Sequence, residues 1–328
     1  MTLRVDVFGF GPIGRELANR LVSERKLEEE FTIASISDSS ATIYPRNSSD
    51  VLKAIESKSV GNKLSKLNFG RKPAKNSKIF IDLASSDYKK ATEAKDRALS
   101  ALSDGKHFVS ASKVALSDSF AEIISYAKER RLEVGFGATI CGARHAISVA
   151  RNMELGEINS VSAVLNASTT MILSMLEENQ DLTFDAACKK ASEAGVLESD
   201  WGIDLDGIDA AAKTAILGNV IFPESNFALR DVSVRGIRDP KARTLINRNR
   251  TNHDARVRLV AEITENKVSV EPKALPLDSP LAVSGRFNVV LFKTKTLGDI
   301  SVRNLGGGIA LTASVIVSDL KKIALIQR

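Results

Sequence analysis

In the first half of the chain, short apolar runs alternate with longer amphipathic segments. The runs have the length and the β-branched content of buried strands, and apolar residues recur with helical period in the segments between them. Strands are expected at 5–8, 33–37, 79–83, 108–110 and 132–135, and helices at 13–24, 49–56, 88–103 and 117–130. Strands separated by helices are typical of βαβ units, so this half is predicted to be an α/β domain with a doubly wound parallel sheet.

Beyond residue 139 the pattern changes. Helices are expected at 143–153, 184–193 and 207–221, strands at 161–166, 257–263 and 287–293, and a final helix within 306–325, which opens with three glycines. The strands alternate like those of a half-buried sheet. We therefore expect a second, α+β domain for catalysis and dimerisation over 139–304, while residues 305–328 join the first domain, 1–138.

Composition narrows the class of protein. The chain has 328 residues, of which 43% are hydrophobic and 26% charged, which is ordinary for a globular protein of two domains. No apolar run approaches the roughly 20 residues that a membrane span needs, and no signal peptide precedes the first strand. The two cysteines, Cys141 and Cys188, are far apart, which suits a reducing compartment. We expect a cytoplasmic protein without a membrane partner.

A net charge of +6 indicates an anionic partner. The densest basic stretch contains Arg238, Lys241, Arg243, Arg248, Arg250, Arg256 and Arg258. Aromatic residues make up only 5% of the chain, too few for an obvious base-stacking surface. A solvated face is therefore favoured for the basic stretch over a nucleic-acid site, and a phosphate-bearing cofactor is favoured as the anion.

A glycine-rich turn follows the first expected strand and opens the first expected helix. It consists of Gly9, Phe10, Gly11, Pro12, Ile13 and Gly14. Glycines at this spacing permit a tight turn, the approach of a pyrophosphate and close packing of helix on strand, while the helix N-terminus offers N–H groups to phosphate. Asp38 ends the second expected strand, where a carboxylate can accept hydrogen bonds from a ribose. The first domain is therefore predicted to be a Rossmann-type domain that binds NAD or NADP.

Asp209 and Lys213 stand four residues apart and share one face of an expected helix. A surface pair of this kind would stabilise the helix by only ~0.3–0.5 kcal/mol. The helix is apolar on nearly every side, which is typical of a buried helix, and buried charges need partners or a task. A functional pair is therefore favoured over a structural one.

Two other interpretations of nearby residues stay open. An acidic cluster comprises Glu198, Asp200, Asp204, Asp206 and Asp209. It could bind Ca²⁺, although the ligand spacing of an EF-hand is not completed, and carboxylates that face a lysine and a substrate ammonium explain it more simply. Cys141 and His145, at an expected helix start, could serve a cysteine-dependent semialdehyde dehydrogenase.

From residue 110 onward the chain carries a series of ordered motifs. They are Ser-Ala-Ser-Lys at 110–113, Asn-Ala-Ser-Thr-Thr at 166–170, the long pattern 195–213, Leu-Pro-Leu-Asp-Ser-Pro-Leu-Ala at 275–282, and the glycines 306–308 followed by Thr312-Ala313 and Asp319-Leu320. In this order they resemble homoserine dehydrogenases almost to the C-terminus. Ala167 stands where the similar family loop, Asn-Gly-Thr-Thr-Asn, has glycine.

The resemblance implies a reversible conversion of L-homoserine to L-aspartate 4-semialdehyde with NADP or NAD, in threonine and methionine biosynthesis. It assigns Lys113 and Lys213 to proton transfer at the C4 oxygen, Asp209 to the orientation of Lys213, and Glu198 to the α-ammonium of the substrate. The substrate site is then expected to contain Ser168, Glu198, Asp204, Asp209 and Lys213. The cofactor site is expected to contain Gly9, Phe10, Gly11, Pro12, Ile13, Gly14, Asp38, Ser39, Ser40, Ala84, Ser85, Ser112, Lys113, Gly308 and Thr312. A homodimer, formed through the second domain, is implied as well.

Two departures from the family pattern matter. Gly-Ala-Thr-Ile at 137–140 lacks the glutamate that helps members of the family to hold a monovalent cation, so no metal is predicted. Because the sequence ends at Arg328, we expect no C-terminal regulatory domain.

The choice of cofactor depends on opposing charges. Asp38 would repel a 2′-phosphate and so favours NAD, whereas Ser39, Ser40, Arg46 and the lysines of 58–66 could bind that phosphate. We expect both cofactors to work, with NADP bound at least as tightly as NAD. A non-enzymatic dinucleotide sensor that binds nucleic acid through its basic stretch stays the alternative from another class.

Overall fold

The computed structural model describes residues 2–327 apart from 70–75, 154–156, 198–200 and 253. The chain divides into two compact units, which we call unit 1 (Met1–Thr139 with Gly308–Arg328) and unit 2 (Ile140–Gly307). Across the described residues, every helix is too short or too polar to span a membrane.

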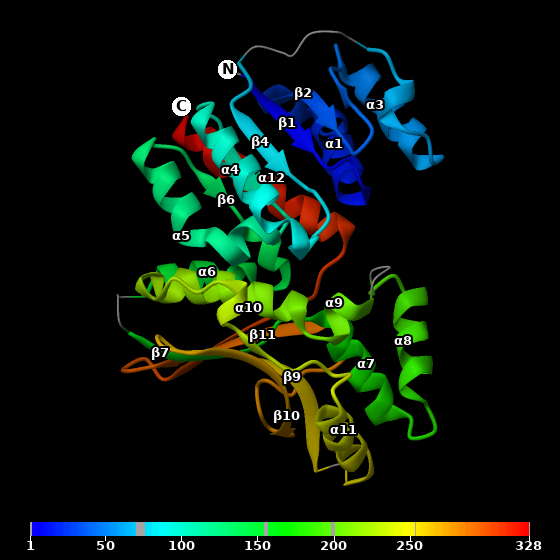
Figure 1. Ribbon diagram of the computed structural model, residues 1–328, viewed down its shortest axis with the longest axis vertical. Helices are drawn as coiled ribbons and strands as arrows, with labels where there is room; N and C mark the ends of the chain where they lie inside the picture. Colours follow the sequence, from blue (N-terminus) through cyan, green and yellow to red (C-terminus); the bar gives the residue numbers. More distant parts are fainter. Residues whose placement is uncertain (1, 70–75, 154–156, 198–200, 253, 328) are drawn as a thin grey trace. The chain divides into compact units, whose positions relative to one another are not determined.

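Unit 1 contains a six-stranded sheet in the order β3-β2-β1-β4-β5-β6 (Figure 1). Its strands are β1 (Leu3–Phe8), β2 (Phe31–Ser37), β3 (Thr42–Ile43), β4 (Ile79–Asp82), β5 (His107–Ser110) and β6 (Val134–Gly135). Neighbouring strands run parallel, apart from the short antiparallel pair β2–β3 at the edge, which the sequence did not predict. The order reverses between β1 and β4, so the predicted doubly wound Rossmann-type fold is confirmed.

Helices cover both faces of this sheet. They are α1 (Pro12–Ser23), α2 (Arg25–Glu30), α3 (Ser48–Ser59), α4 (Ala91–Ser103), α5 (Val114–Glu129) and α12 (Ile309–Ile326). Right-handed crossovers on either side of the reversal place α1 and α4 on opposite faces. The C-terminal helix α12, red in Figure 1, packs against α1. Buried Asp319 on α12 accepts a hydrogen bond from the Gly137 N–H at 2.9 Å, which ties the returning segment to the end of β6.

Unit 2 contains a second sheet, in the order β12-β11-β7-β9-β10-β8. Its strands are β7 (Ile158–Val164), β8 (Ser233–Val234), β9 (Ala255–Ile263), β10 (Val268–Pro276), β11 (Phe287–Thr294) and β12 (Asp299–Leu305). Its helices are α6 (Arg144–Arg151), α7 (Ala167–Glu178), α8 (Phe184–Glu193), α9 (Trp201–Leu205), α10 (Ile208–Ile221) and α11 (Pro240–Asn252). Neighbouring strands are antiparallel except β8 and β10, so the predicted α+β class is confirmed.

Two helices of unit 2 start where the sequence provides a clear local reason. The side chain of Asn166 caps α7 by accepting the Thr169 N–H at 3.0 Å. Gly207, with φ +83°, has the left-handed conformation that separates α9 from α10. Both α7 and α10 pack on the sheet, which brings the start of α7 to the first turns of α10.

Candidate active site

The glycine turn joins β1 to α1 at the carboxyl edge of the parallel sheet. Gly9 has φ +94°, and a Cβ at this position would lie 2.4 Å from the backbone carbon of Leu83. A Cβ at Gly14 would lie 2.5 Å from the carbonyl oxygen of Gly9. A Cβ at Gly11, in contrast, would meet nothing within 4 Å. Two glycines therefore pack the turn, while the third leaves open space at the helix N-terminus, where a pyrophosphate would need it.

Asp38 lies just beyond β2 and is held by several donors. Its carboxylate accepts hydrogen bonds from Lys58 Nζ at 2.8 Å, from the backbone N–H and hydroxyl of Ser40 at 2.7 and 2.6 Å, and from the Ala41 N–H at 3.2 Å. Burial by itself would raise the pKa of Asp38, but the Lys58 ammonium and the other donors lower it to about 2. The carboxylate is thus ionised and paired, and the Ser40 hydroxyl is already donated to it. Arg46, another candidate for a phosphate, pairs with Asp50 at 2.8 Å.

The ends of β4 and β5 carry the next predicted cofactor residues. Asp82 is fully buried and accepts the Ala84 N–H at 3.0 Å and the guanidinium of Arg97 at 2.9 Å, which fixes the loop that touches Gly9. The hydroxyl of Ser112 is buried and has no hydrogen-bond partner among the described residues. A buried hydroxyl of this kind suits a bound ligand. Lys113 follows directly, at the start of α5.

In unit 2, the predicted pair on α10 forms. Lys213 Nζ lies 2.7 Å from Asp209 Oδ2, and the two side chains are only 17% and 14% exposed. The same ammonium donates to the Leu165 carbonyl oxygen at 2.9 Å. Two of its three protons are therefore directed to fixed partners.

A second carboxylate and an amide complete this cluster. The amide nitrogen of Asn166 donates to Asp204 Oδ1 at 2.7 Å and to Asp209 Oδ2 at 3.2 Å. Burial and the neighbouring Asp209 charge raise the pKa of Asp204, although the Asn166 hydrogen bond opposes this. Asn166 was not among the predicted site residues. The signal for it in the sequence is its place at the start of the motif 166–170, two residues before Ser168.

The remaining predicted substrate residues are Ser168 and Glu198. The Ser168 hydroxyl is buried and donates to Asn166 Oδ1, so it belongs to the cluster. Asp206, a member of the acidic cluster but not of the predicted substrate site, pairs with Arg238, with Nε to Oδ1 at 2.7 Å. Glu198 lies outside the described residues, as does Asp200. Within the described part of the chain, no three metal-binding side chains gather as a metal site would require.

Comparison with known proteins shows to which family the chain belongs. Residues 147–320 match the family model for homoserine dehydrogenase. The chain is 33% identical to the homoserine dehydrogenase of Methanocaldococcus jannaschii over 96% of both chains, and 33% identical to that of Pyrococcus horikoshii over 99% of this chain and 98% of the other. The chain belongs to the homoserine dehydrogenase family. Among solved structures, a hyperthermophilic archaeal homoserine dehydrogenase in complex with NADPH superposes with a TM-score of 0.81 at 33% identity, covering 99% of this chain and 98% of that one.

The motif of three glycines at 306–308 marks the return of the chain from unit 2 to unit 1. A Cβ at Gly306 would lie 2.4 Å from Ala167 Cβ, so this glycine packs directly beside the start of α7. Gly308 has φ +132° and precedes α12, and its carbonyl oxygen accepts the Thr312 hydroxyl at 2.9 Å. The predicted cofactor residues Gly308 and Thr312 therefore belong to unit 1, together with the glycine turn.

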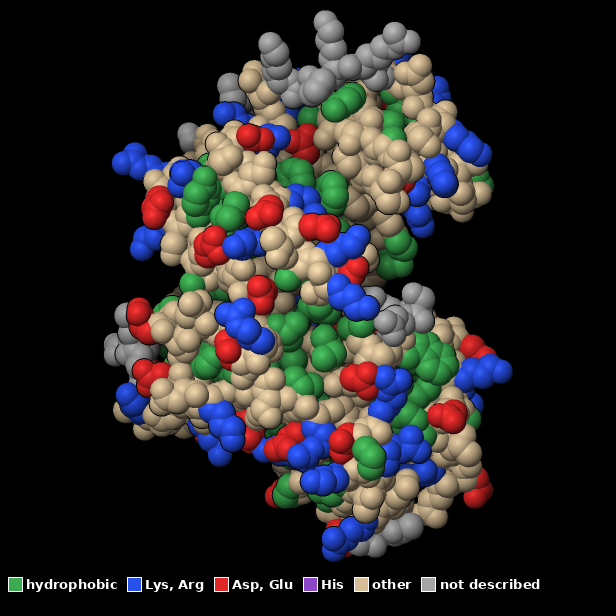
Figure 2. Space-filling model, in the orientation of Figure 1, with side chains coloured by type: hydrophobic (Ala, Val, Ile, Leu, Met, Phe, Trp, Pro, Cys, Tyr) green, Lys and Arg blue, Asp and Glu red, His purple; other side chains and the backbone are tan. Residues whose placement is uncertain are grey.

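The interpretation of the basic stretch as a solvated face is wrong for several of its members. Arg258 is fully buried and binds Glu177 through two hydrogen bonds of 2.6 and 3.0 Å. Arg250 donates to the carbonyl oxygens of residues 179, 180 and 182. Lys241 and Arg248 are exposed, as expected. On the face shown in Figure 2, basic and acidic side chains are interspersed. The guanidinium groups of Arg250 and Arg258 are instead bound by backbone carbonyl oxygens and by a carboxylate.

The described residues add no support for a cysteine-dependent semialdehyde dehydrogenase. Burial raises the pKa of the Cys188 thiol to about 11, which leaves it unreactive near neutral pH. The side chain of Cys141 is outside the described part, and His145 is exposed on α6.

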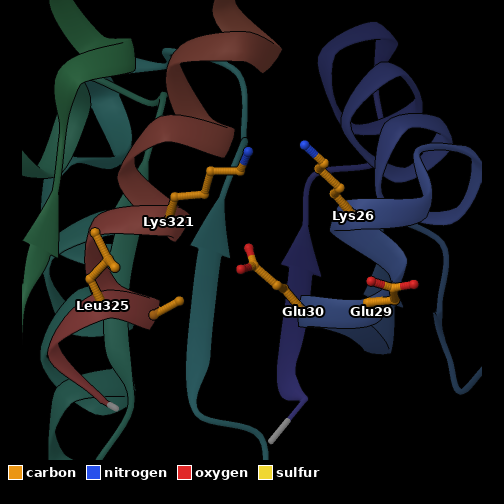
Figure 3. Close-up of a pocket in the computed structure, with 6 residues that line it drawn as sticks. Lys26, Glu29, Glu30, Lys321 and Leu325 are labelled. Carbon is orange, nitrogen blue, oxygen red and sulfur yellow. The ribbon is translucent and has the colours of Figure 1, made fainter.

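Unit 1 also contains a cavity of about 420 Å³ between α2 and α12. Lys26 and Lys321 point toward each other across it, with Glu30 below them (Figure 3). Glu30 directly precedes β2, so the cavity lies at the amino ends of the strands. Ligands of open α/β sheets bind at the carboxyl ends, where the glycine turn lies, and this cavity is therefore not the dinucleotide site.

Proposed function

We propose that the chain is a homoserine dehydrogenase, which interconverts L-homoserine and L-aspartate 4-semialdehyde with NADP or NAD. Its family supports this activity, and one observation carries it at the level of residues. Lys213 is held on a buried helix by the carboxylate of Asp209 and by a backbone carbonyl, with a further proton left to share. A dehydrogenase that acts on an alcohol needs such a group to move the hydroxyl proton.

The cofactor site is proposed in unit 1. The open space at Gly11, the helix N-terminus beyond it and the buried hydroxyl of Ser112 fit a dinucleotide. The side chain of Phe10 is buried, so this residue offers only its backbone. When bound, the nicotinamide supplies or accepts the hydride at C4 of the substrate. The paired state of Asp38 supports use of NADP as well as NAD, because Lys58 balances the charge that would repel a 2′-phosphate.

Proton transfer is assigned to the lysines. In the reducing direction Lys213, as an ammonium, donates a proton to the C4 oxygen, and in the oxidising direction the neutral amine accepts it. Asp209 orients the amine and balances its positive charge. Lys113, which precedes α5 in unit 1, is proposed as the second lysine of proton transfer.

Substrate recognition is assigned to the residues around Asn166. Ser168 lies at the start of α7, and Asp204 lies near the end of α9. Glu198 is proposed to bind the α-ammonium of the substrate by a charge-assisted hydrogen bond. We further propose that the protein is a cytoplasmic homodimer, because the resemblance of its motifs to the family implies a dimer. The molar mass from light scattering tests the dimer.

A spectrophotometric assay tests the proposed function. Purified protein is mixed with L-homoserine and NADP⁺ or NAD⁺, and the absorbance of the reduced nicotinamide is followed. We expect turnover that depends on homoserine, with L-serine, which is one carbon shorter, as the control substrate. Absence of turnover with both cofactors, in protein shown to be folded, would overturn the proposal.

A further inference from the structure

The junction between β7 and α7 contacts both members of the Asp209–Lys213 pair. The carbonyl oxygen of Leu165 accepts the Lys213 ammonium at 2.9 Å. The next residue, Asn166, donates its amide to Asp209 at 3.2 Å and to Asp204 at 2.7 Å. Two consecutive residues thus hold the lysine and its carboxylate from the same backbone segment.

The Asn166 amide is fully used. A primary amide has two N–H donors and an oxygen with two lone pairs. The two donors serve the two carboxylates, while the oxygen accepts the Thr169 N–H at 3.0 Å and the hydroxyl of Ser168. A flipped amide would direct its oxygen at the carboxylates and its N–H groups at two donors. The orientation is therefore fixed, and the side chain is 2% exposed.

Capping a helix does not require this arrangement. A cap needs one oxygen acceptor, and Ser, Asp and Asn serve almost equally well. Within the same unit, Thr183 caps α8 by accepting the Ala186 N–H at 3.2 Å. The amide nitrogen of Asn166 has no part in capping, and its two contacts go to carboxylates of α9 and α10.

We propose that Asn166 is a positioning residue, which ties the start of α7 to both carboxylates and so keeps Asp209 turned toward Lys213. This rests on the proposed function, because it concerns the group assigned to proton transfer. Asn166 acts through Asp209 rather than on the substrate.

The position of the amide predicts a change in pH dependence. Hydrogen bonds to an ionised carboxylate favour the ionised form. The Asn166 amide therefore opposes the rise in the pKa of Asp204 that burial and Asp209 cause. Without the amide, the two carboxylates take up a shared proton at a higher pH. The Asp209–Lys213 pair then weakens at a higher pH, so the acid limb of the kcat profile moves upward.

Three variants separate positioning from capping. Asn166→Ser keeps an oxygen cap for α7 but has no amide to reach the carboxylates. Asn166→Ala loses both functions. Thr183→Ala removes a comparable cap from α8, far from the carboxylates in sequence, and is the matched control. Each is measured for melting temperature, for kcat and KM with homoserine, and for the pH profile of kcat.

We expect Asn166→Ser to lose ~10- to 100-fold in kcat, about as much as Asn166→Ala, since small misplacements of a reacting group have effects of this size. Its acid limb should shift to higher pH while its melting temperature stays close to that of the wild type. Thr183→Ala should melt earlier with unchanged kcat and pH profile. A wild-type kcat and acid limb in Asn166→Ser, with active wild type, would overturn the positioning role and leave the proposed function standing.

If the wild type itself fails to oxidise homoserine, the proposed function fails but the arrangement can still be measured. Carbon-13 NMR of protein labelled at aspartate carboxyls follows the titration of the pair without substrate. A shift of that titration to higher pH in Asn166→Ser supports the role of the amide. An unchanged titration overturns it.

Discussion

Lys58→Met is the most informative change at the proposed cofactor site. It keeps the length and the apolar stem of the side chain but removes the ammonium, which lies 2.8 Å from Asp38 Oδ2. The Asp38 side chain is 10% exposed, so solvent cannot fully replace the lost charge. The carboxylate keeps its hydrogen bonds from Ser40 and Ala41, yet it becomes an unbalanced negative charge at the proposed ribose site.

The size of the effect follows from the pKa of Asp38. A pKa lowered from 3.8 to about 2 corresponds to roughly 2 kcal/mol, and Lys58 supplies one of the largest contributions. A charge-assisted hydrogen bond is worth about 1.5–3 kcal/mol. Loss of the ammonium should therefore weaken NADP binding ~10- to 100-fold, while NAD, which has no 2′-phosphate, should change less than about threefold.

The assay is a pair of dissociation constants, for NADPH and NADH, from cofactor fluorescence at low and moderate salt. Lys53→Met is the matched control, because Lys53 lies exposed on the same helix, α3. Asp38→Ser added to Lys58→Met should restore much of the NADP affinity. Unchanged NADP affinity in Lys58→Met, together with a strong NAD preference that Asp38→Ser abolishes, would refute the reasoning and show that the carboxylate decides.

The same pair predicts a pH dependence of stability. The pKa of Asp38 is lower in the folded chain than in the unfolded one, so the ionised carboxylate stabilises the fold above about pH 4, and this stabilisation is lost as the pH falls toward 2. Urea unfolding of Lys58→Met should therefore show its largest loss of stability near neutral pH and little difference at pH 2. An equal loss at both pH values would contradict the ion pair as its cause.

Four further predictions concern catalysis and binding. Lys213→Ala and Lys113→Ala should each lower kcat at least ~100-fold with little change in dinucleotide affinity, and near-normal turnover in both would contradict the assigned proton transfer. Glu198→Gln should mainly raise KM for homoserine, whereas an unchanged KM with a lower melting temperature would make Glu198 structural. Gly9→Ala should abolish dinucleotide binding, because its Cβ would lie 2.4 Å from the backbone of Leu83, and normal calorimetric binding would argue against this cradle. Iodoacetamide should leave the activity unchanged. A loss of activity on alkylation would instead favour a mechanism that uses the thiol of Cys141.

Much of unit 1 could be predicted from sequence, because its signals are local. Buried parallel strands are short apolar runs, and the glycine turn encodes its own conformation through residues that tolerate no side chain, such as Gly9 and Gly14. The spacing of Asp209 and Lys213 is also enough to predict that they pair, since side chains four residues apart lie together on any helix. Identification of the family rested on ordered motifs, which likewise need no coordinates.

Several elements of unit 2 could not be predicted in this way. β12 exposes alternate residues and carries charges, α11 is rich in arginine and asparagine, and β10 contains Pro272 and Pro276. None of them shows a clear apolar period, although β10 pairs with β9 and β12 pairs with β11, in each case the strand directly before it in the chain. Buried Arg258 is the clearest case, since its charge is balanced by Glu177 on α7, 81 residues away.

The same distinction separates the two kinds of site residue. Sequence alone determined which residue types could bind a dinucleotide and move a proton, because these requirements are chemical and local. Only the tertiary structure decided that Lys58 would balance Asp38, that Asp206 would turn to Arg238, and that Asn166 would join Asp204 to Asp209. Each of these contacts spans 20 or more residues, and such a pairing is fixed by how the elements pack, which no local pattern records.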